Sequence, residues 1–111
     1  MTEMIDVVLN AIDSTKAENV VSLDVRHLTA LTDYMVIATG DNSRHMRAII
    51  NKVIITLKEN GIIPLSLEGE QTGEWILLDI GDVVLHVMLQ STRDFYALEK
   101  LWGMHPTASA A

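Results

Sequence analysis

The chain has 111 residues, 49% of them apolar, so it can bury one hydrophobic core and is too short for two ordinary domains. It contains no cysteine, which excludes disulfides, zinc–thiolate sites and iron–sulfur clusters and fits a reducing compartment. Fifteen acids against eight bases give a net charge of −7, which disfavours binding to nucleic-acid phosphates and anionic lipid.

The first half of the sequence predicts a helix, two strands and a second helix. Apolar residues recur at helical spacing over 3–17, and a β-branched run at 20–25 predicts a strand. Residues 34–39 are apolar nearly throughout, which predicts a central strand covered on both faces. Ser43 is then the predicted N-cap of a helix that ends at Asn60-Gly61. Its apolar stripe consists of Met46, Ile49, Ile50, Val53, Ile54 and Leu57.

The second half predicts three strands and a short helix. We expect a strand at 62–67 and a hairpin of 74–79 and 83–89, whose turn contains Gly81. Ser91 is the predicted cap of a last helix that runs through Trp102. The order α-β-β-α-β-β-β-α predicts an α/β (α+β) fold with a mixed five-stranded sheet backed by helices. We expect one domain over 1–102 and a flexible tail over 103–111.

The N-terminus and the hydropathy pattern predict where the chain resides. Glu3 and Asp6 occupy a region where a secretory signal would need positive charge. No apolar run is long enough to cross a bilayer. We therefore expect a soluble, cytoplasmic protein.

The acids are concentrated late in the chain. Residues 1–60 carry eight acids and six bases, whereas residues 61–111 carry seven acids and two bases. No Lys or Arg lies between Lys58 and Arg93, an interval that contains Glu59, Glu68, Glu70, Glu74, Asp79 and Asp82. A solvated surface that aids solubility explains this pattern. A docking patch for a basic protein, such as a ribosomal protein, explains it as well.

Both strands of the predicted hairpin carry large apolar groups on both faces. One face must meet the helices, and the other is either covered internally or contacts a partner. That second face mixes Trp or Met with Asp or His, and a Trp anchor beside acids is typical of an interface hot spot. Trp75 closing the core is the equally weighted alternative.

The sequence offers little for catalysis or metal binding. Metal-assisted phosphoryl transfer needs converging carboxylates, which on a strand means D-x-D spacing. Asp79 and Asp82 are three apart across a turn, and Glu68 and Glu70 flank a Gly outside a strong strand pattern. His86 is expected to be packed or hydrogen-bonded rather than a ligand. We therefore predict no catalytic residue, metal or cofactor.

A nucleotide-binding or nucleotidyltransferase-like domain is the alternative from a different class. The turn 39–43 joins a strand to a helix, and Arg44, His45 and Arg47 follow it, so helix amides and guanidinium groups could bind phosphate. One Gly and one Ser do not make a phosphate loop, and neither Walker nor G-x-G-x-x-G spacing is present. An ordinary capped turn is the favoured interpretation.

Three groups of motifs resemble the ribosomal silencing factor family (RsfS, also called Iojap), in family order and spacing over about residues 3–102. They are LTDYMVIATG at 31–40 with SRH at 43–45; EGE at 68–70, EWILLD at 74–79 and GDVV at 81–84 with HV at 86–87; and RDFYALEKLW at 93–102. Asp41-Asn42 departs from the small hydroxyl residues usual in the family and makes an anion site there less favourable.

The resemblance implies a non-enzymatic translation repressor with a fold similar to nucleotidyltransferases but without their catalytic carboxylates. It implies binding to the fourteenth protein of the large ribosomal subunit, which blocks joining of the small subunit when nutrients are scarce. Carried onto this chain, the contact residues are Glu68, Trp75, Asp79, Tyr96 and Trp102. Trp102 packing its helix onto the sheet, and an apolar hairpin face that pairs with a second copy of the free chain, remain alternatives.

Overall fold

A computed structural model describes residues 3–96 of the chain. The elements follow the predicted order and confirm the mixed α+β class with five strands. They are α1 (Met4–Asp13), β1 (Glu18–Asp24), β2 (Tyr34–Gly40), α2 (Ser43–Glu59), β3 (Ser66–Glu68), β4 (Trp75–Asp79), β5 (Val83–Leu89) and α3 (Gln90–Tyr96).

The five strands form one sheet in the order β1-β2-β5-β4-β3. Strands β2 and β5 pair in parallel at its centre, and the other three pairs are antiparallel. The connection from β2 to β5 passes through α2 and the β3–β4 pair, so the last strand inserts between two strands that precede it. The predicted hairpin of β4 and β5 is confirmed, with Gly81 at a φ of 101° in its turn.

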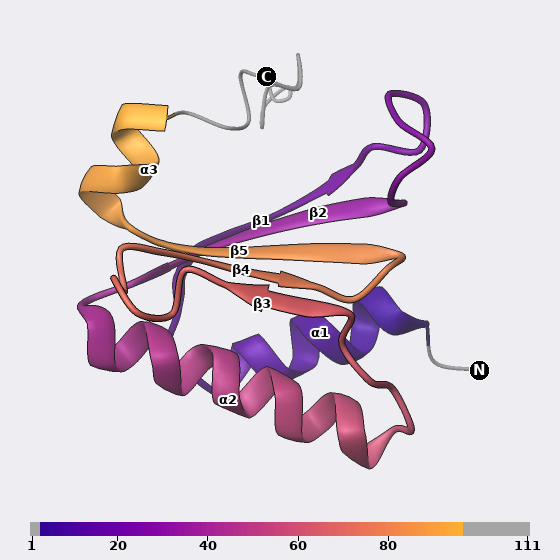
Figure 1. Ribbon diagram of the computed structural model, residues 1–111, viewed down its shortest axis with the longest axis horizontal. Coiled ribbons are helices and arrows are strands. Elements are labelled where there is room, and N and C mark those ends of the chain that lie inside the picture. The colour runs from indigo at the N-terminus through magenta and orange to yellow at the C-terminus, as the bar shows by residue number, and fades with distance from the viewer. Residues whose placement is uncertain (1–2, 97–111) are drawn as a thin grey trace.

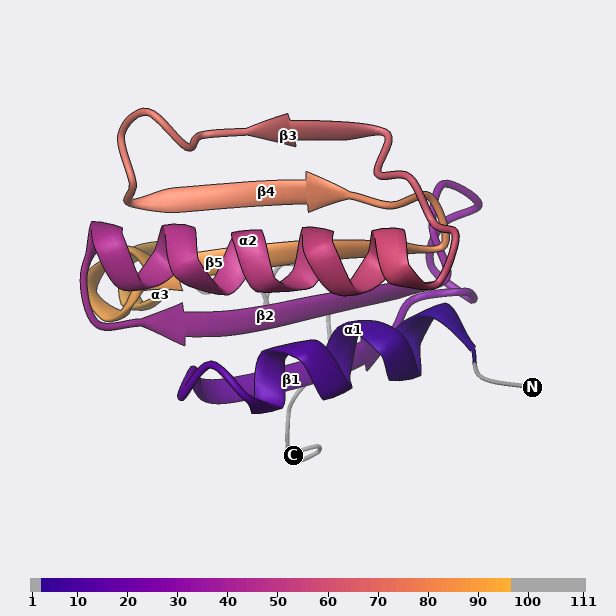
Figure 2. The ribbon, with the colours of Figure 1, turned by 90° about the horizontal axis from the view of Figure 1, so that it is seen from below.

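Helices α1 and α2 lie side by side on one face of the sheet, here called the inner face (Figures 1 and 2). The predicted stripe of α2 packs there, with Ile49, Val53 and Leu57 fully buried. Inward side chains of β2, β4 and β5 complete this core, because side chains alternate across a strand. The N-cap is Asn42, whose side chain accepts from the amide of His45, so the prediction of Ser43 as the cap was wrong.

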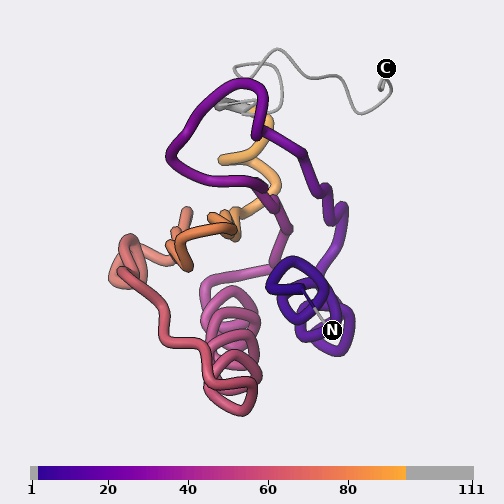
Figure 3. The backbone as a smooth tube through the Cα atoms, turned by 90° about the vertical axis from the view of Figure 1, so that its right-hand side faces the viewer, coloured from indigo at the N-terminus to yellow at the C-terminus, as the bar shows by residue number. Residues whose placement is uncertain are grey.

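The opposite face, here called the outer face, carries a second apolar cluster of Leu23, Val25, Met35, Ile37 and Met88. Strand β2 is thus covered on both faces, as predicted. Helix α3 lies on this outer side, at one end of the sheet (Figure 1). The tube view shows the sheet between α1 and α2 on one side and α3 on the other (Figure 3).

Among the boundaries that differ from prediction, three have a local reason. The first helix ends at Asp13, and Lys16 has a φ of 64°, which a right-handed helix cannot accommodate. Strand β3 contains only three residues because Pro64 has no amide hydrogen to donate. Ser91 lies inside α3 and does not cap it, since the helix begins at Gln90. The predicted continuation over 97–102 lies outside the described residues.

Candidate functional site

The register of the sheet aligns the side chains of the outer face in rows. Cross-strand partners point to the same side, so each row crosses from the acidic edge at β3 to the apolar edge at β1. One row contains Glu68, Leu77, His86, Ile37 and Val21, and the next contains Ser66, Asp79, Val84, Met35 and Leu23. The outer face is therefore acidic on one side and apolar on the other.

Solvent reaches the outer face mainly on the β3–β4 side. The outer-face side chains there are exposed or half-buried, whereas Ile37, Met35 and Met88 near the centre are buried. We call five of them the outer patch: Glu68, Trp75, Leu77, Asp79 and Val84. The patch combines two carboxylates with apolar surface, which is the composition predicted for an interaction site.

Trp75 begins β4 and lies half-buried against the outer apolar cluster. Its indole Nε1 donates to Nδ1 of His86 at 2.9 Å, and the two ring centroids are 5.8 Å apart with an interplanar angle of 46°. Trp75 pairs directly with Met88, so His86 is its diagonal neighbour, within reach of an aromatic side chain. Trp75 thus contributes to the core and to the surface together, and neither sequence-based interpretation describes it alone.

His86 is the buried member of this pair, with 6% of its surface exposed. Burial disfavours the imidazolium and lowers the pKa of His86 to about 4. The ring is therefore neutral near pH 7, and Nδ1 can accept from the indole while Nε2 carries the ring proton. The prediction that His86 is packed and hydrogen-bonded is confirmed.

Glu68, Gly69, Trp75 and Leu77 line a shallow hollow of about 220 Å³ on the outer patch. The turn that forms it requires glycine, because Gly69 has a φ of 84° and a Cβ there would lie 2.0 Å from the carbonyl oxygen of Trp75. This close approach fixes the backbone of Glu68 beside the start of β4. The structure therefore brings together two of the predicted contact residues, Glu68 and Trp75.

The other predicted contact residues lie in different surroundings. Asp79 ends β4 half-buried on the same face, and its Oδ1 accepts from the amide of Gly81 at 2.9 Å, so it also holds the hairpin turn. Tyr96 is the last residue of α3. Trp102 lies outside the described residues.

Helix α3 is attached to the sheet through Arg93, which is 7% exposed. Its Nη1 donates to the carbonyl oxygen of Asn19 and, at 3.0 Å, to Oγ1 of Thr39. Asn19 also donates from its side chain to Gln90 at 3.2 Å. Asn19 lies where the register of β1 with β2 shifts, between Glu18 and Val21. Two hydrogen bonds therefore tie this irregular start of β1 to α3, which places the helix beside the outer face.

The segment 40–47 is engaged in contacts within the fold. Asn42 caps the amide of His45, and Ser43 Oγ donates to the carbonyl oxygen of Gly73 at 3.1 Å. Arg47 donates to the carbonyl oxygen of Glu70 at 3.2 Å. These groups hold the 69–73 turn against α2, which favours the structural interpretation of this segment over a phosphate site.

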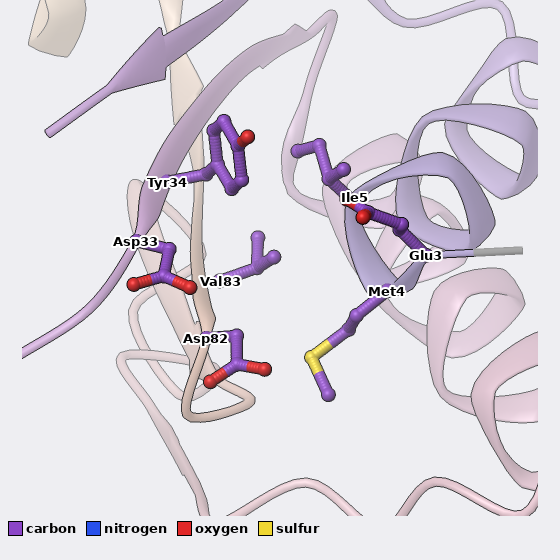
Figure 4. Close-up of a pocket in the computed structure, with 7 residues that line it drawn as sticks. All are labelled: Glu3, Met4, Ile5, Asp33, Tyr34, Asp82 and Val83. Carbon is purple, nitrogen blue, oxygen red and sulfur yellow. The ribbon is translucent and has the colours of Figure 1, made fainter. Parts of the chain in front are cut away.

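A second hollow, of about 260 Å³, lies between the start of α1 and the starts of β2 and β5 (Figure 4). Glu3, Asp33 and Asp82 line it, beside Met4 and Tyr34. Its lining includes no Lys or Arg, so it does not suit a phosphate group.

Among residues 3–96, no group of three or more His, Asp or Glu side chains is placed to hold a metal ion. Over the same range, no helix has both the length and the apolar character needed to span a bilayer.

Sequence reasoning missed the role of His86 as the partner of Trp75. The hairpin register contains the signal, because a turn at 80–82 places Leu77 opposite His86 and puts Trp75 on the same face. The alternation within each strand is a local property of the sequence, whereas the contact of Trp75 with His86 also depends on the register between the strands.

The fold and its outer face define a small α+β protein with a mixed sheet, in which a half-buried Trp75 bonds a buried His86. The sequence matches, over residues 1–111, the family described as "Ribosomal silencing factor during starvation". The ribosomal silencing factor RsfS of Chromobacterium violaceum is 43% identical over 101 residues, which cover 91% of this chain and 83% of that protein. RsfS of Halalkalibacterium halodurans is 38% identical, with 95% of this chain and 90% of that protein covered. The chain belongs to the ribosomal silencing factor family.

Solved structures and a more distant relative agree with this assignment. A crystal structure from Chromobacterium violaceum superposes with a TM-score of 0.87 at 41% identity, covering 92% of this chain and 88% of that one. A structure from Bacillus halodurans gives 0.82 at 36% identity, covering 89% and 92%. The mouse protein named "Mitochondrial assembly of ribosomal large subunit protein 1" is 33% identical over 90% of this chain and 45% of its own length.

Proposed function

We propose that this protein binds the large ribosomal subunit through the fourteenth large-subunit protein and sterically blocks joining of the small subunit. Translation would thereby be repressed when nutrients are limited. The observation that carries the proposal is the outer patch, which combines the half-buried Trp75 with the carboxylates of Glu68 and Asp79 on one face of the sheet. Membership of the ribosomal silencing factor family supports a ribosomal partner, and the name of the mouse relative refers to the large ribosomal subunit.

The chemistry of the patch suits a basic protein surface. A tryptophan that is partly buried on its own chain offers a rigid apolar area, and aromatic anchors of this kind dominate binding energies at interfaces. Carboxylates around it attract Lys and Arg and steer association. The net charge of −7 disfavours direct binding to ribosomal RNA, so a protein partner fits better.

We propose that the protein acts by binding alone, without catalysis or cofactor, as one domain over residues 1–102 in the cytoplasm. Tyr96 and Trp102 are proposed as further contact residues. Self-association of the free chain through the same patch would compete with this role. Sedimentation velocity over a range of concentrations measures that competition.

The direct test is a subunit-joining assay. Large subunits are incubated with this chain, small subunits are added, and the mixture is separated on a sucrose gradient. We expect the chain to sediment with large subunits and to reduce the amount of joined ribosomes. Glu68→Lys should weaken both effects, because it reverses a charge on the outer patch and slows association with a basic partner.

The matched control is Glu59→Lys, which makes the same charge reversal at the exposed end of α2, on the inner side of the sheet. It should behave as wild type. Unchanged joining in the presence of excess wild-type chain would contradict the proposed function.

A further inference from the structure

The Trp75–His86 pair joins a buried side chain to one that solvent reaches. His86 is 6% exposed, in the middle of β5, and Trp75 is half-buried at the outer patch. The only donor of an indole is its Nε1–H, and here it points inward to His86 Nδ1 at 2.9 Å. The hydrogen bond therefore fixes which edge of the indole faces the sheet and which part of the ring faces outward.

We propose that His86 is a positioning residue for partner binding, which holds the Trp75 indole in the orientation that the partner contacts. This inference rests on the proposed function, since it concerns the same outer patch. His86 does not touch the partner in this arrangement. Its contribution is to order the indole before binding, which lowers the entropy that association must otherwise remove.

The surroundings of His86 make it a firm anchor. In the sheet register it lies between Leu77 of β4 and Ile37 of β2, with parallel pairing on one side and antiparallel pairing on the other. Ile37 is fully buried and Leu77 is half-buried, so the imidazole has little room to follow a rotation of the indole. A rotation of Trp75 away from its place would leave Nδ1 buried without this donor, which is unfavourable.

The bond requires a neutral imidazole, because an imidazolium has no acceptor nitrogen. Burial lowers the pKa of His86 to about 4, so the acceptor is present throughout the physiological range. An apolar residue at this central strand position would pack at least as well. The polar ring is explained by the indole that it orients.

The test compares two substitutions at this position. His86→Leu keeps an apolar side chain of similar bulk but removes the acceptor, whereas His86→Asn places an amide oxygen near the position of Nδ1. Val36→Ala, on the fully buried inner side of β2, serves as a destabilised control that leaves the pair intact. For each variant, affinity for large subunits is measured by quantitative pelleting, and the Trp75 indole N–H resonance is recorded by NMR. The resonance is assigned by its loss in Trp75→Phe.

We expect the indole resonance of His86→Leu to move upfield and its affinity to fall about 5- to 10-fold, because association must then order the indole side chain. His86→Asn should retain the indole shift and most of the affinity. Val36→Ala should lose stability but keep the shift and bind like wild type.

Two results would overturn the inference while wild type still binds: a His86→Leu variant as tight as wild type, or a His86→Asn variant that keeps the indole shift but binds as weakly as His86→Leu. Wild type that fails to pellet with large subunits would instead refute the proposed function, and the inference with it.

Discussion

Arg93 of α3 donates a hydrogen bond to the backbone carbonyl of Asn19, a residue that lies in β1 at a φ of 49°. This contact joins the last described helix to the first strand, across most of the length of the chain. The same guanidinium nitrogen bonds Thr39 of β2. Helix α3 is therefore held in place by residues of β1 and β2, in the first half of the sequence.

Arg93→Met should release α3 from the sheet. The substitution removes the bond to the exposed Asn19 and leaves the buried Thr39 hydroxyl without this donor, which for a buried group costs about 1–3 kcal/mol. Hydrogen–deuterium exchange should rise in residues 90–96, and urea denaturation should show lower stability. Arg44→Met, at an exposed position of α2, is the control and should leave both measurements unchanged. Unaltered exchange in Arg93→Met would show that other contacts hold the helix.

Trp75→Ala should weaken binding to large subunits by about 2 kcal/mol or more, as for other aromatic anchors. Trp75→Phe should retain part of the affinity, because it keeps an aromatic ring but loses the donor to His86. Isothermal titration with the isolated partner protein gives both values. Equal affinity of Trp75→Ala and wild type, with an unchanged circular dichroism spectrum, would remove Trp75 from the site.

Glu68→Lys should act on the rate of association. Glu68 is exposed at the edge strand, where a charge steers encounter more than it stabilises the complex. We expect a lower association rate constant with a flatter dependence on salt, measured by stopped flow at several ionic strengths. A change confined to the dissociation rate would argue against electrostatic docking.

The stability of the protein should fall as the pH decreases from about 6.5 to about 4. The unfolded His86 has an ordinary pKa near 6.5, whereas the folded pKa is about 4, so in this window the unfolded chain binds the extra proton. The free energy of unfolding that depends on neutral His86 is fully present above pH 6.5. It decreases as the pH falls and is lost once the pH passes through 4. The pKa shift corresponds to at most about 3 kcal/mol. Urea denaturation of wild type and His86→Asn across this range isolates it. Parallel stability curves for the two proteins would contradict the assignment.

Calorimetric titration with ATP and magnesium should give no saturable heat. The groups around Ser43 that could bind a phosphate are engaged with Asn42, Gly73 and the 69–73 turn. A clear binding isotherm would revive the nucleotide-binding alternative. Arg47→Met would then test that segment as the site, since the Arg47 guanidinium donates to the carbonyl oxygen of Glu70 in that turn.

Much of the fold could be predicted because periodicity is a local property. The apolar stripe of α2 and the hairpin of β4 and β5 follow from residue spacing and one glycine turn, and both are confirmed. The end of the first helix was wrong by four residues, since the left-handed conformation of Lys16 depends on the path into β1. Strand β3 was placed too early because an apolar run at 62–65 outweighed the effect of Pro64.

The site was less predictable because it depends on register across strands. Trp75, Glu68 and Asp79 were singled out from composition and resemblance, and the structure places them on one face of the sheet. The hydrogen bond to His86 needed the hairpin register in addition. The Arg93–Asn19 contact joins residues 74 positions apart and has no local signal.

The place of β5 between β2 and β4 has a consequence for how the chain folds during its own synthesis. The β1–β2 and β3–β4 pairs can each form early, but they share no strand until residues 83–89 have been translated. The two pairs of strands then join through β5 in one late, long-range step, which is slow compared with local pairing. A nascent chain stalled before residue 83 should therefore remain protease-sensitive, even though three quarters of the sequence has been made.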